Sequence, residues 1–438
     1  MTRFLFGNKK KRACVVGLDG VPYSLLRSLM ASGVMPETAE IVSRGRIEPM
    51  TVTLPEISSV SWSTFMTGAN PGAHGIFGFT DLSEKGYGLR FPSFADLQMP
   101  TIWDRLGELG MRSVVINQPA TYPARPIPGA LVSGFVAVDL AKSVAPATYL
   151  PELERRGYRI DIDTARCRED PALIFPQLQE LLESRRAAID LLWESERWNL
   201  MEIVVTGTDR LHHFMWDACE QEDHPHREEF LAYYRRLDGL IRDIFDRCER
   251  SGAGDRFFIL SDHGFCGTRK EMHVNAVLRK AGFLDIPPGV ASLEEITEST
   301  KAFALDPARI YLNRKGRFPK GSVTDGEADD LLDELETVFR LIEHDGERVI
   351  GRIVRREEAY EGPFADRGPD MLLLPKRGFD LKGRPGPGEI FGDRRLQGMH
   401  TWDDAFFFSI DPSAHGDSRR LNIIDVPAAI MASLGVEI

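Results

Sequence analysis

The stretch "RACVVGLDG" (residues 12–20) is a short apolar run that ends in an acidic residue and a glycine. A continuous apolar run bounded by a turn signal predicts a buried β-strand. Four further runs have the same character: "SVVIN" (113–117), "MEIVVTG" (201–207), "RFFILS" (256–261) and "DAFFFSI" (404–410). Strands that are apolar on both faces are typical of parallel sheets covered on each side. The sequence therefore predicts a mostly parallel central sheet.

Helical segments lie between these runs. The segments 101–110, 176–195 and 226–252 carry apolar residues at positions i, i+3, i+4 and i+7, and the last of them ends at Gly252. Strands and amphipathic helices in alternation indicate an α/β fold in which helices flank the sheet. With 438 residues, the chain is long enough for one large α/β domain with an insertion or for two domains.

Residues 265–395 have a different character. They contain Gly/Pro-rich turns such as "RFPKGSV" and "KGRPGPGEIFG", and an acidic helix is predicted over 325–344. We predict that 265–395 is an inserted cap and that 1–264 and 396–438 together form the core domain. The closing segment "RRLNIIDVPAAIMASLGVEI" (419–438) is predicted to return to the core as a strand and a helix.

Composition and charge narrow the function classes. The formal net charge of −12 argues against nucleic acid as a partner, but not against a small anionic substrate, because bound metal ions reverse a local field. The five cysteines have no CxxC spacing, so neither a disulfide framework nor a thiolate zinc site is expected. No apolar stretch approaches the roughly 20 residues of a membrane span, and the N-terminal segment lacks the apolar core of a secretion signal. These features predict a cytoplasmic protein without a membrane partner.

Acidic and imidazole side chains collect where the predicted strands end, and ligands of open parallel sheets bind outside these carboxyl ends. The side chains belong to Asp19, Asp209, His213, Asp262, His263 and His400. Each one alone has an ordinary explanation, such as a turn residue, a surface pair or a histidine satisfied by its neighbours. Together they supply three carboxylates and three imidazoles, enough for two divalent ions of the Zn²⁺ or Mn²⁺ type. Such a pair of ions is a recurring device for phosphoryl transfer.

The segment "LPEISSVSWSTFMTGANPGAHGIFGF" (54–79) is rich in hydroxyl groups before it breaks into a Gly/Pro turn. Trp62, Phe65 and Met66 have helical spacing, so most of the preceding serines are predicted to cap the start of a helix. A hydroxyl at this position would also meet unpaired backbone N–H groups and the positive end of the helix dipole. This environment favours an anionic phosphoryl group and an attacking serine oxygen.

Six short motifs follow one another along the chain. They are Asp19 after the first strand, Ser58 nine residues before Thr67-Gly68, "PGAHGI" (71–76), Asp209 four residues before His213, "DHG" (262–264) and "GMH" (398–400). This set resembles the alkaline phosphatase superfamily and, most closely, its type I phosphodiesterase/nucleotide pyrophosphatase branch. Order and spacing match from about residue 12 to the C-terminus. The resemblance implies an alkaline-phosphatase-like three-layer sandwich with an inserted cap.

The resemblance also implies residue roles. One metal ion would be held by Asp19, Ser58, Asp262 and His263, and the other by Asp209, His213 and His400. Zn²⁺ is the first expectation for these ions and Mn²⁺ the second. Ser58 would attack phosphorus and form a covalent phosphoserine, which water then hydrolyses. The substrate would be a small phosphoester or nucleotide-like molecule, cleaved at a phosphodiester or nucleotide pyrophosphate bond, and His74 would hold the Gly/Pro turn.

The sequence departs from the branch at the nucleophile. The branch usually has threonine there and often asparagine three residues later, where this chain has Ser58 and Ser61. Ser59 is a neighbouring alternative for the nucleophile. Contacts to a phosphoryl oxygen then fall to the Ser59 backbone N–H, to Ser61, or to basic residues of the insertion such as Lys270 and His273. Losing one such donor costs about 10²-fold or more in rate, so a preference for diesters does not follow.

Other functions of the same superfamily stay open. A phosphomonoesterase normally adds a cation against the extra phosphoryl charge, and no arginine adjoins Ser58 in the sequence. A phosphosugar mutase would carry a larger insertion than the segment 80–200. A sulfatase is disfavoured because "SSVSW" (58–62) lacks the Pro and Arg of that branch. A non-catalytic metal-binding scaffold would have lost a ligand or the nucleophile, and none is missing.

Substrate choice is expected to depend on the loops within 80–150 and on the insertion. Four aromatic residues are candidates for stacking on a base or sugar, although core packing is the commoner explanation: Phe265, Tyr311, Phe318 and Phe391. The oligomeric state is open, with a homodimer as one alternative.

Overall fold

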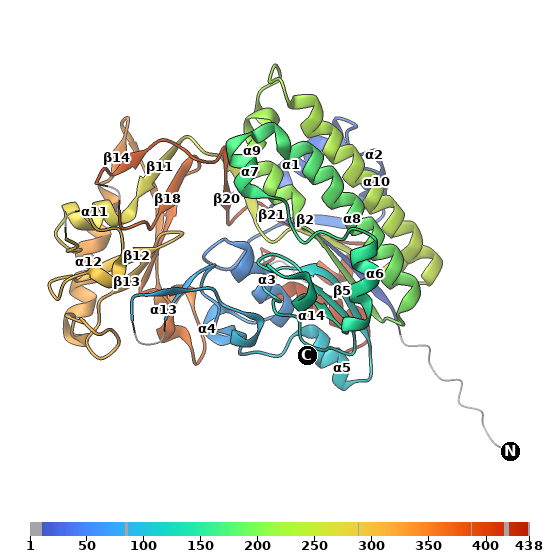
Figure 1. Ribbon diagram of the computed structural model, residues 1–438, viewed down its shortest axis with the longest axis horizontal. Coiled ribbons are helices and arrows are strands. Elements are labelled where there is room, and N and C mark those ends of the chain that lie inside the picture. The colour runs from blue at the N-terminus through green and yellow to red at the C-terminus, as the bar shows by residue number, and fades with distance from the viewer. Residues whose placement is uncertain (1–10, 84–85, 288, 387, 416–419, 437–438) are drawn as a thin grey trace.

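The computed structural model describes residues 11–83, 86–287, 289–386, 388–415 and 420–436. Its centre is an eight-stranded sheet in the order β2-β21-β9-β1-β8-β5-β6-β7 (Figure 1). The strands are β1 (Ala13–Leu18), β2 (Arg46–Met50), β5 (Ser113–Gln118), β6 (Gly129–Ser133), β7 (Val144–Ala145), β8 (Leu200–Val205), β9 (Phe257–Leu260) and β21 (Ala405–Ser409). Neighbours from β9 to β6 run parallel, whereas β2, β21 and β7 pair antiparallel. The predicted mostly parallel sheet is confirmed.

The central strand β1 is buried over its whole length. Cys14 and Val16 pack into one hydrophobic cluster, while Ala13 and Val15 pack into another on the opposite face. Successive strand side chains point to opposite faces, so a strand covered on both sides has to be apolar at every position. This explains the continuous apolar run in the sequence.

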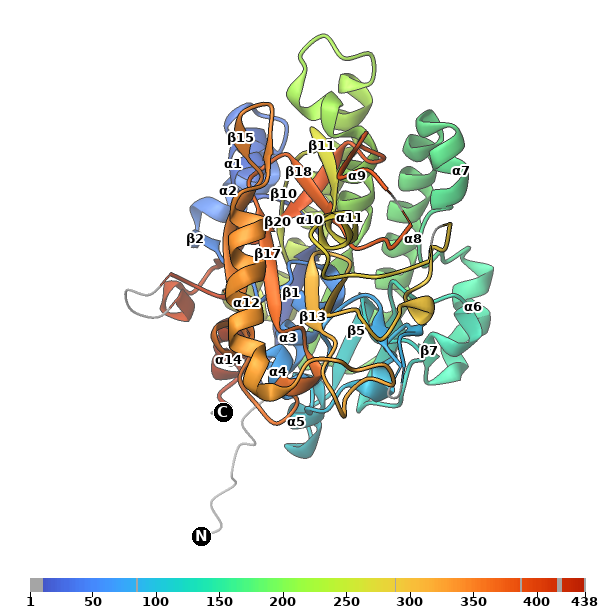
Figure 2. The same cartoon turned by 90° about the vertical axis from the view of Figure 1, so that its left-hand side faces the viewer.

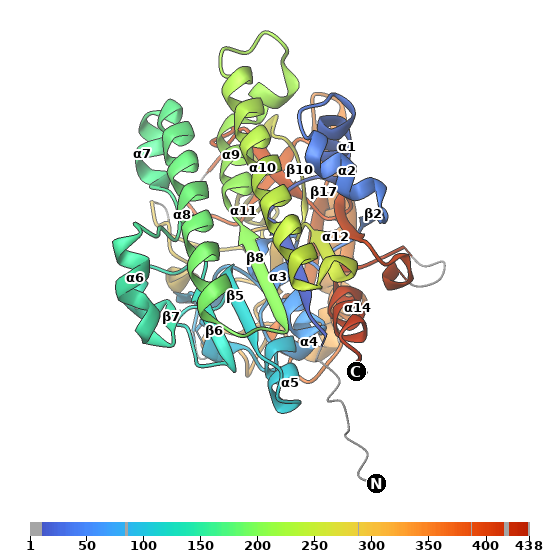
Figure 3. The same ribbon diagram turned by 90° about the vertical axis from the view of Figure 1, so that its right-hand side faces the viewer.

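Helices cover both faces of the sheet (Figure 1 and Figure 3). One layer contains α1 (Tyr23–Ala31), α2 (Pro36–Ser43), α8 (Ile174–Ser195), α9 (Gly207–Glu220) and α10 (Arg227–Ser251), and the other contains α3 (Ser58–Thr67), α5 (Ile102–Glu108) and α14 (Val426–Ser433). The short helices α6 (Leu150–Arg155) and α7 (Thr164–Glu169) precede α8. Helix α10 ends as predicted, because Gly252 adopts the left-handed conformation with φ 77°.

The inserted region builds a lobe that faces the viewer in Figure 2, and this lobe has its own hydrophobic core. One sheet has the order β12-β13-β17-β16 and another the order β18-β11-β19. The elements are β11 (Lys270–His273), α11 (Val274–Lys280), β12 (Ala302–Leu305), β13 (Arg309–Leu312), α12 (Asp325–Arg340), β16 (Ile350–Arg355), α13 (Arg356–Ala359), β17 (Met371–Pro375), β18 (Phe379–Lys382) and β19 (Phe391–Gly392). Tyr87, between β3 (Asp81–Leu82) and β4 (Leu89–Arg90), also joins this core. The domain boundaries at 265 and 395 stay a prediction.

The acidic helix of the lobe is shorter than predicted. It ends at Arg340, and β14 (Glu343–His344) and β15 (Glu347–Arg348) form a hairpin in place of its last turn. Asp345 and Gly346 connect the two strands with φ angles of 51° and 78°. An Asp-Gly pair with both φ angles positive is the usual signal for a tight hairpin. This local turn chemistry outweighs the helical spacing around it.

The closing segment has its predicted helix, α14, but not its predicted strand. Residues Ile423–Asp425 form a 3-10 turn that is capped by Asn422, and Asn422 makes a single isolated bridge with Thr51. The reciprocal capping of Asn422 and Asp425 satisfies the local backbone donors without a strand partner.

Among the described residues, no helix combines the length and the apolar character needed to cross a membrane. Residues 1–10, on which the expectation of no secretion signal depended, lie outside the described part of the chain.

Candidate active site

The sheet brings the predicted site residues to one edge. Asp19 follows β1, Asp209 lies in the first turn of α9 after β8, and Asp262 and His263 follow β9. These strands are parallel neighbours, so their carboxyl ends meet. Ser58 is the first residue of α3. His400 lies on β20 (Gly398–Thr401), which pairs antiparallel with β10 (Gly264–Gly267) and so returns the chain from the lobe to this edge.

The inner cluster consists of Ser58, Asp19, Asp262 and His263. Ser58 Oγ lies 3.1 Å from Asp19 Oδ1 and 3.2 Å from His263 Nε2. His263 Nε2 lies 3.5 Å from Asp19 Oδ1 and 3.4 Å from Asp262 Oδ2. The backbone N–H of Gly20 donates to Asp262 Oδ1, at 2.9 Å. His263 Nδ1 lies 3.0 Å from its neighbour's carbonyl oxygen, Gly264 O, which favours a proton on Nδ1 and leaves Nε2 as an acceptor or metal ligand.

The outer cluster consists of Asp209, His213 and His400. Asp209 Oδ1 lies 3.4 Å from His213 Nε2 and 3.2 Å from His400 Nε2, and the two Nε2 atoms are 3.1 Å apart. His213 Nδ1 lies 3.0 Å from the carbonyl oxygen of Gly398, and His400 Nδ1 lies 2.9 Å from that of Glu56. A backbone acceptor on Nδ1 turns Nε2 inward, which is the usual arrangement around a metal-binding histidine.

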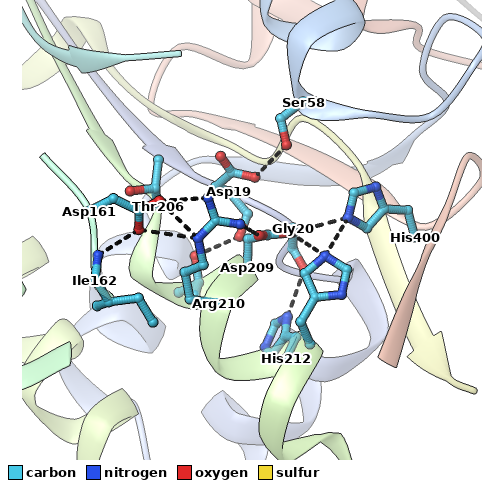
Figure 4. A network of polar contacts seen from close by, with 12 residues as sticks. Asp19, Gly20, Ser58, Asp161, Ile162, Thr206, Asp209, Arg210, His212 and His400 are labelled. Carbon is cyan, nitrogen blue, oxygen red and sulfur yellow. Dashed lines mark hydrogen bonds and ion pairs between the residues drawn. The ribbon is translucent and has the colours of Figure 1, made fainter. Parts of the chain in front are cut away.

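The two clusters touch through His263 (Figure 4 shows Ser58, Asp19, Asp209 and His400). The rings of His263 and His400 stack with centroids 3.8 Å apart. Ligand atoms of Asp209, His263 and His400 lie within 4.8 Å of one another, and so do those of Asp19, Asp262 and His263. His263 is therefore within reach of both groups, and the division of ligands between two ions stays a prediction.

The crowded carboxylates fit a cation. Burial, reinforced by the charges of Asp262 and Asp209, raises the pKa of Asp19 well above its usual value. Burial likewise raises the pKa of Asp262 to about 7. Burial lowers the pKa of His213 to about 4, so this imidazole is neutral and able to bind a metal. Asp262 Oδ2 is buried and accepts no hydrogen bond from the described residues. A buried carboxylate oxygen without a donor, beside the neutral imidazoles of His213 and His263, matches the ligand chemistry of divalent transition metals.

The serines at the start of α3 do not cap it, contrary to the prediction. The N-cap residue is Ile57, and no side chain accepts a hydrogen bond there. Ser58 instead turns its hydroxyl toward the inner cluster, because Asp19 accepts a hydrogen bond from it. Ser59 lines the adjacent cavity, whereas Ser61 is fully buried, and the hydroxyl oxygens of both have no hydrogen-bond partner among the described residues. The predicted role of Ser61 in substrate binding has no support from its position.

A cavity of about 370 Å³ opens between the clusters and the lobe. Its walls include Ser58, Glu56, Phe79, Phe135, Arg210 and Lys382. The rings of Phe79 and Phe135 are stacked, with centroids 5.1 Å apart. Five of these six residues were not predicted as site residues. Arg210 directly follows Asp209, and Glu56 and Phe79 lie in the segment 54–79 around Ser58, which are usable signals, but nothing in the local sequence marks Phe135 or Lys382.

A family model of type I phosphodiesterases and nucleotide pyrophosphatases matches residues 13–403. The chain belongs to this family. A comparison with curated proteins finds no match.

Solved structures of the alkaline phosphatase superfamily are similar to this family member. Phosphonoacetate hydrolase from Sinorhizobium meliloti 1021, in complex with phosphonoformate, is 16% identical with a TM-score of 0.63, covering 97% of this chain and 95% of that one. A murine ectonucleotide pyrophosphatase/phosphodiesterase 5 in complex with AMP is 13% identical with a TM-score of 0.57, at the same coverages. These similarities confirm the alkaline-phosphatase-like α/β fold, and the family supports phosphoester hydrolysis.

The basic residues predicted to contact a phosphoryl oxygen lie elsewhere in this family member. Lys270 Nζ pairs with Asp393 at 2.9 Å, and His273 Nδ1 lies 2.9 Å from the carbonyl oxygen of Glu389. Both belong to β11, and neither lines the cavity. The cavity takes its cations from α9 and β18 instead, since helix and strand packing, rather than closeness in sequence, decides which side chains reach it.

The four aromatic candidates pack against neighbours and do not line the cavity. Phe265 contacts the rings of His213 and His400, Tyr311 and Phe318 both pack on Phe303, and Phe391 packs on His344. The packing explanation is the one that the structure supports.

Two other histidines have structural roles. His74 Nε2 lies 3.1 Å from Thr64 Oγ1, and its Nδ1 accepts a hydrogen bond from the backbone N–H of Ile76, as expected for a residue that holds the Gly/Pro turn. His212 lies between the carbonyl oxygen of Gly20 and the hydroxyl of Tyr234. Burial lowers the pKa of each histidine to about 3, so both are neutral packing groups.

Proposed function

We propose that this protein hydrolyses a small phosphoester in two metal-dependent steps with Ser58 as the nucleophile. Phosphodiester and nucleotide pyrophosphate bonds are the first substrate class, and phosphomonoesters are the alternative. The observation that carries the proposal is the contact of Ser58 Oγ with Asp19 and His263, at 3.1 and 3.2 Å. A serine hydroxyl that replaces its capping role with a contact to buried metal-type ligands is arranged for nucleophilic attack.

Two divalent ions, Zn²⁺ first and Mn²⁺ second, would stabilise charge on the entering and departing oxygens. We assign the inner cluster to one ion and the outer cluster to the other, as the resemblance implies. The fit rests on the buried Oδ2 of Asp262, which lacks a donor, and on the two groups of converging ligand atoms.

The Ser58 hydroxyl gives up its proton, for which Asp19 Oδ1 is a neighbouring acceptor, and Oγ bonds to phosphorus while the bond between phosphorus and the leaving-group oxygen breaks on the opposite side. The first backbone N–H groups of α3, on Ser58 and Ser59, have no acceptor among the described residues and can donate to a phosphoryl oxygen. Water then attacks the phosphoserine and breaks its Oγ–P bond. The Ser58 hydroxyl regains a proton, and phosphate or a phosphomonoester is released.

The other assignments follow from the sequence. A cytoplasmic location agrees with five cysteines that are all free. A homodimer stays one alternative for the oligomeric state. The phosphosugar mutase stays an alternative, disfavoured because such an enzyme would carry a larger insertion than the segment 80–200. The non-catalytic scaffold is less favoured still, because the nucleophile and all six metal-type residues are present.

The test compares Ser58→Ala with the matched control Ser59→Ala on bis(p-nitrophenyl) phosphate and p-nitrophenyl phosphate, with metal content measured in each protein. We expect Ser58→Ala to lose at least about 10³-fold in kcat on both esters even with Zn²⁺ or Mn²⁺ supplied to saturation, and Ser59→Ala to stay within about tenfold. Mass spectrometry of wild type quenched during turnover should find a phosphoryl group on Ser58. Near-normal turnover by Ser58→Ala would contradict the covalent mechanism.

A further inference from the structure

Arg210 is the arginine that lines the cavity, and Lys382 is the only lysine that does so within the described residues. The Arg210 side chain is 11% exposed. Its Nε lies 3.1 Å from both carboxylate oxygens of Asp161, and its Nη2 donates to Asp161 Oδ2 at 2.6 Å. Its Nη1 donates to Asp209 Oδ2 at 3.0 Å (Figure 4). The guanidinium is thus fixed between a remote loop and the outer cluster.

The plane of this guanidinium is fixed as well. Its central carbon lies 4.2 Å from the ring centroid of Phe135, which itself lines the cavity. An arginine paired on one edge and stacked on an aromatic face loses little further entropy when it binds a ligand.

Part of the donor capacity of Arg210 is left over. A guanidinium has five N–H groups, and the contacts with Asp161 and Asp209 use three of them. The other two have no acceptor among the described residues, and the side chain shares the cavity wall with Ser58 and Ser59. Partly buried N–H donors without acceptors lower the stability of the folded protein, and a ligand that accepts their hydrogen bonds removes this penalty.

The charge of Asp209 makes the remaining donors selective. Asp209 Oδ1 faces His213 and His400, and Oδ2 is held by Arg210, so both of its oxygens have partners. An anion beside Arg210 therefore meets its free donors and not a free oxygen of Asp209, while the other acids of the cavity wall are Glu56, Asp306 and Asp380. The planar guanidinium matches pairs of oxygens on carboxylates and phosphates, and the attraction grows with the charge on the oxyanion.

We propose that Arg210 donates hydrogen bonds to a non-bridging oxygen of the phosphoryl group and thereby selects dianionic phosphoryl groups, those of phosphomonoesters, over the monoanionic group of diesters. This inference rests on the proposed phosphoester hydrolysis, and of its two substrate classes it favours the alternative, phosphomonoesters, over diesters. It supplies from the tertiary structure the cation that a monoesterase requires and that the sequence around Ser58 lacks.

Lys382 offers the matched comparison in the same cavity. It lies on β18 of the lobe, and its ammonium is 2.6 Å from Asp380 Oδ2. Replacing it with methionine removes one cavity cation without touching the outer cluster. Arg210→Met removes the other, and Arg210→Lys restores the charge without the planar fork.

The experiment measures kcat/KM on p-nitrophenyl phosphate and bis(p-nitrophenyl) phosphate for each variant, together with bound metal. We expect Arg210→Met to lower the monoester value about 10²-fold and the diester value less than tenfold, at unchanged metal content. Arg210→Lys should recover part of the monoester loss, and Lys382→Met should change both esters by a similar small factor. Equal losses on both esters, or lost metal, would mean that Arg210 only positions Asp209 and would overturn the proposal.

Binding measurements separate this inference from the proposed function. In the metal-loaded Ser58→Ala protein, which needs no turnover, calorimetry compares inorganic phosphate with dimethyl phosphate, a monoanion. Adding Arg210→Met should raise the Kd of phosphate at least tenfold and leave that of dimethyl phosphate nearly unchanged. Unchanged phosphate binding would overturn the proposal even if wild type hydrolyses both esters. If Arg210→Met fails to fold, Asp161→Asn loosens the same guanidinium, and the same loss of phosphate selectivity is expected.

Discussion

The inner and outer clusters use the same ligand chemistry on different supports. Asp19, Asp262 and His263 follow strands in the middle of the core sheet, and each is at most 2% exposed. In the outer cluster, His213 lies on α9 and His400 on β20, and both side chains are 18% exposed. His400 is also held by the carbonyl oxygen of Glu56, a cavity residue. The inner cluster is thus part of the rigid sheet, whereas the outer cluster faces the cavity and depends on the junction with the lobe.

This difference indicates that the two clusters contribute differently to stability and to substrate access. A fully buried group of carboxylates is costly without a cation, so the inner cluster carries the larger electrostatic penalty. The outer cluster is accessible enough to exchange water and substrate. Its neighbour Arg210 contacts Asp209 and also lines the cavity. Removing the metal, replacing a buried acid outside the clusters and replacing single ligands each test this difference between the clusters.

Metal removal has the largest expected effect, because it disables both clusters at once. Treatment with EDTA should lower kcat at least about 10⁴-fold, and adding Zn²⁺ or Mn²⁺ should restore it. The metal-free protein should also melt at a lower temperature, since ions that bind only the folded state no longer stabilise it. Activity that survives complete metal removal, checked by elemental analysis, would contradict the proposed chemistry.

Glu202 on β8 is a buried acid outside the inner and outer clusters, and it tests how much such an acid changes the stability of the fold. Its Oε2 accepts a hydrogen bond from Trp103 Nε1 at 2.9 Å, but Oε1 has no partner, and burial raises the pKa of Glu202 to about 8. The folded state therefore holds a proton that the unfolded state releases near pH 4.5. The stability that this proton contributes is fully present below pH 4.5 and is lost as the pH rises to about 8, with an upper bound of about 5 kcal/mol.

The measurement is denaturant unfolding between pH 5 and 9. Glu202→Gln keeps an acceptor for Trp103 and removes the titration, so its stability should fall less with pH than that of wild type. Parallel pH profiles of the two proteins would show that Glu202 titrates normally.

Single ligand replacements distinguish the two clusters directly. Asp262→Asn and His213→Ala should each lower kcat at least about 100-fold and reduce the bound metal. In the metal-free state at a pH above the Asp262 pKa of about 7, Asp262→Asn should stabilise the fold by about 1–3 kcal/mol, because it removes a buried charge from the crowded carboxylates. His213→Ala removes a neutral ring from a half-open site and should not stabilise the fold. Thermal melts after EDTA treatment provide the comparison, and equal responses of the two variants would remove the distinction between the clusters.

Ser61 has the smallest expected effect. Its hydroxyl is buried without a partner, and it does not line the cavity. Ser61→Ala should change the free energy of unfolding by less than about 1 kcal/mol and kcat/KM by less than about threefold. A loss of more than tenfold on a diester substrate, measured at equal metal content, would restore the role in oxyanion binding that the sequence predicted.

Whether a feature of this protein could be predicted from the sequence depends on how far apart along the chain the interacting residues lie. The strands β1, β5, β8, β9 and β21 were predictable, because burial on both faces leaves a continuous apolar run. The end of α12 and the 3-10 turn before α14 were missed, because turn and capping chemistry over a few residues outweighs periodicity. Most serines at the start of α3 were predicted as caps, but no side chain caps this helix. Ser58, the predicted nucleophile, contacts Asp19, which is 39 residues away in the sequence.

The sequence by itself determined that acids and imidazoles would end the parallel strands, and the motif order indicated the family. Only the tertiary structure decided which atoms meet. Asp209 and His400, 191 residues apart, come within 3.2 Å, and Asp161 fixes Arg210 from 49 residues away. Residue type and local periodicity specify an element and its buried face. The direction of a side chain across a cavity depends on how whole elements pack, so the cation of the cavity could not be read from the residues around Ser58.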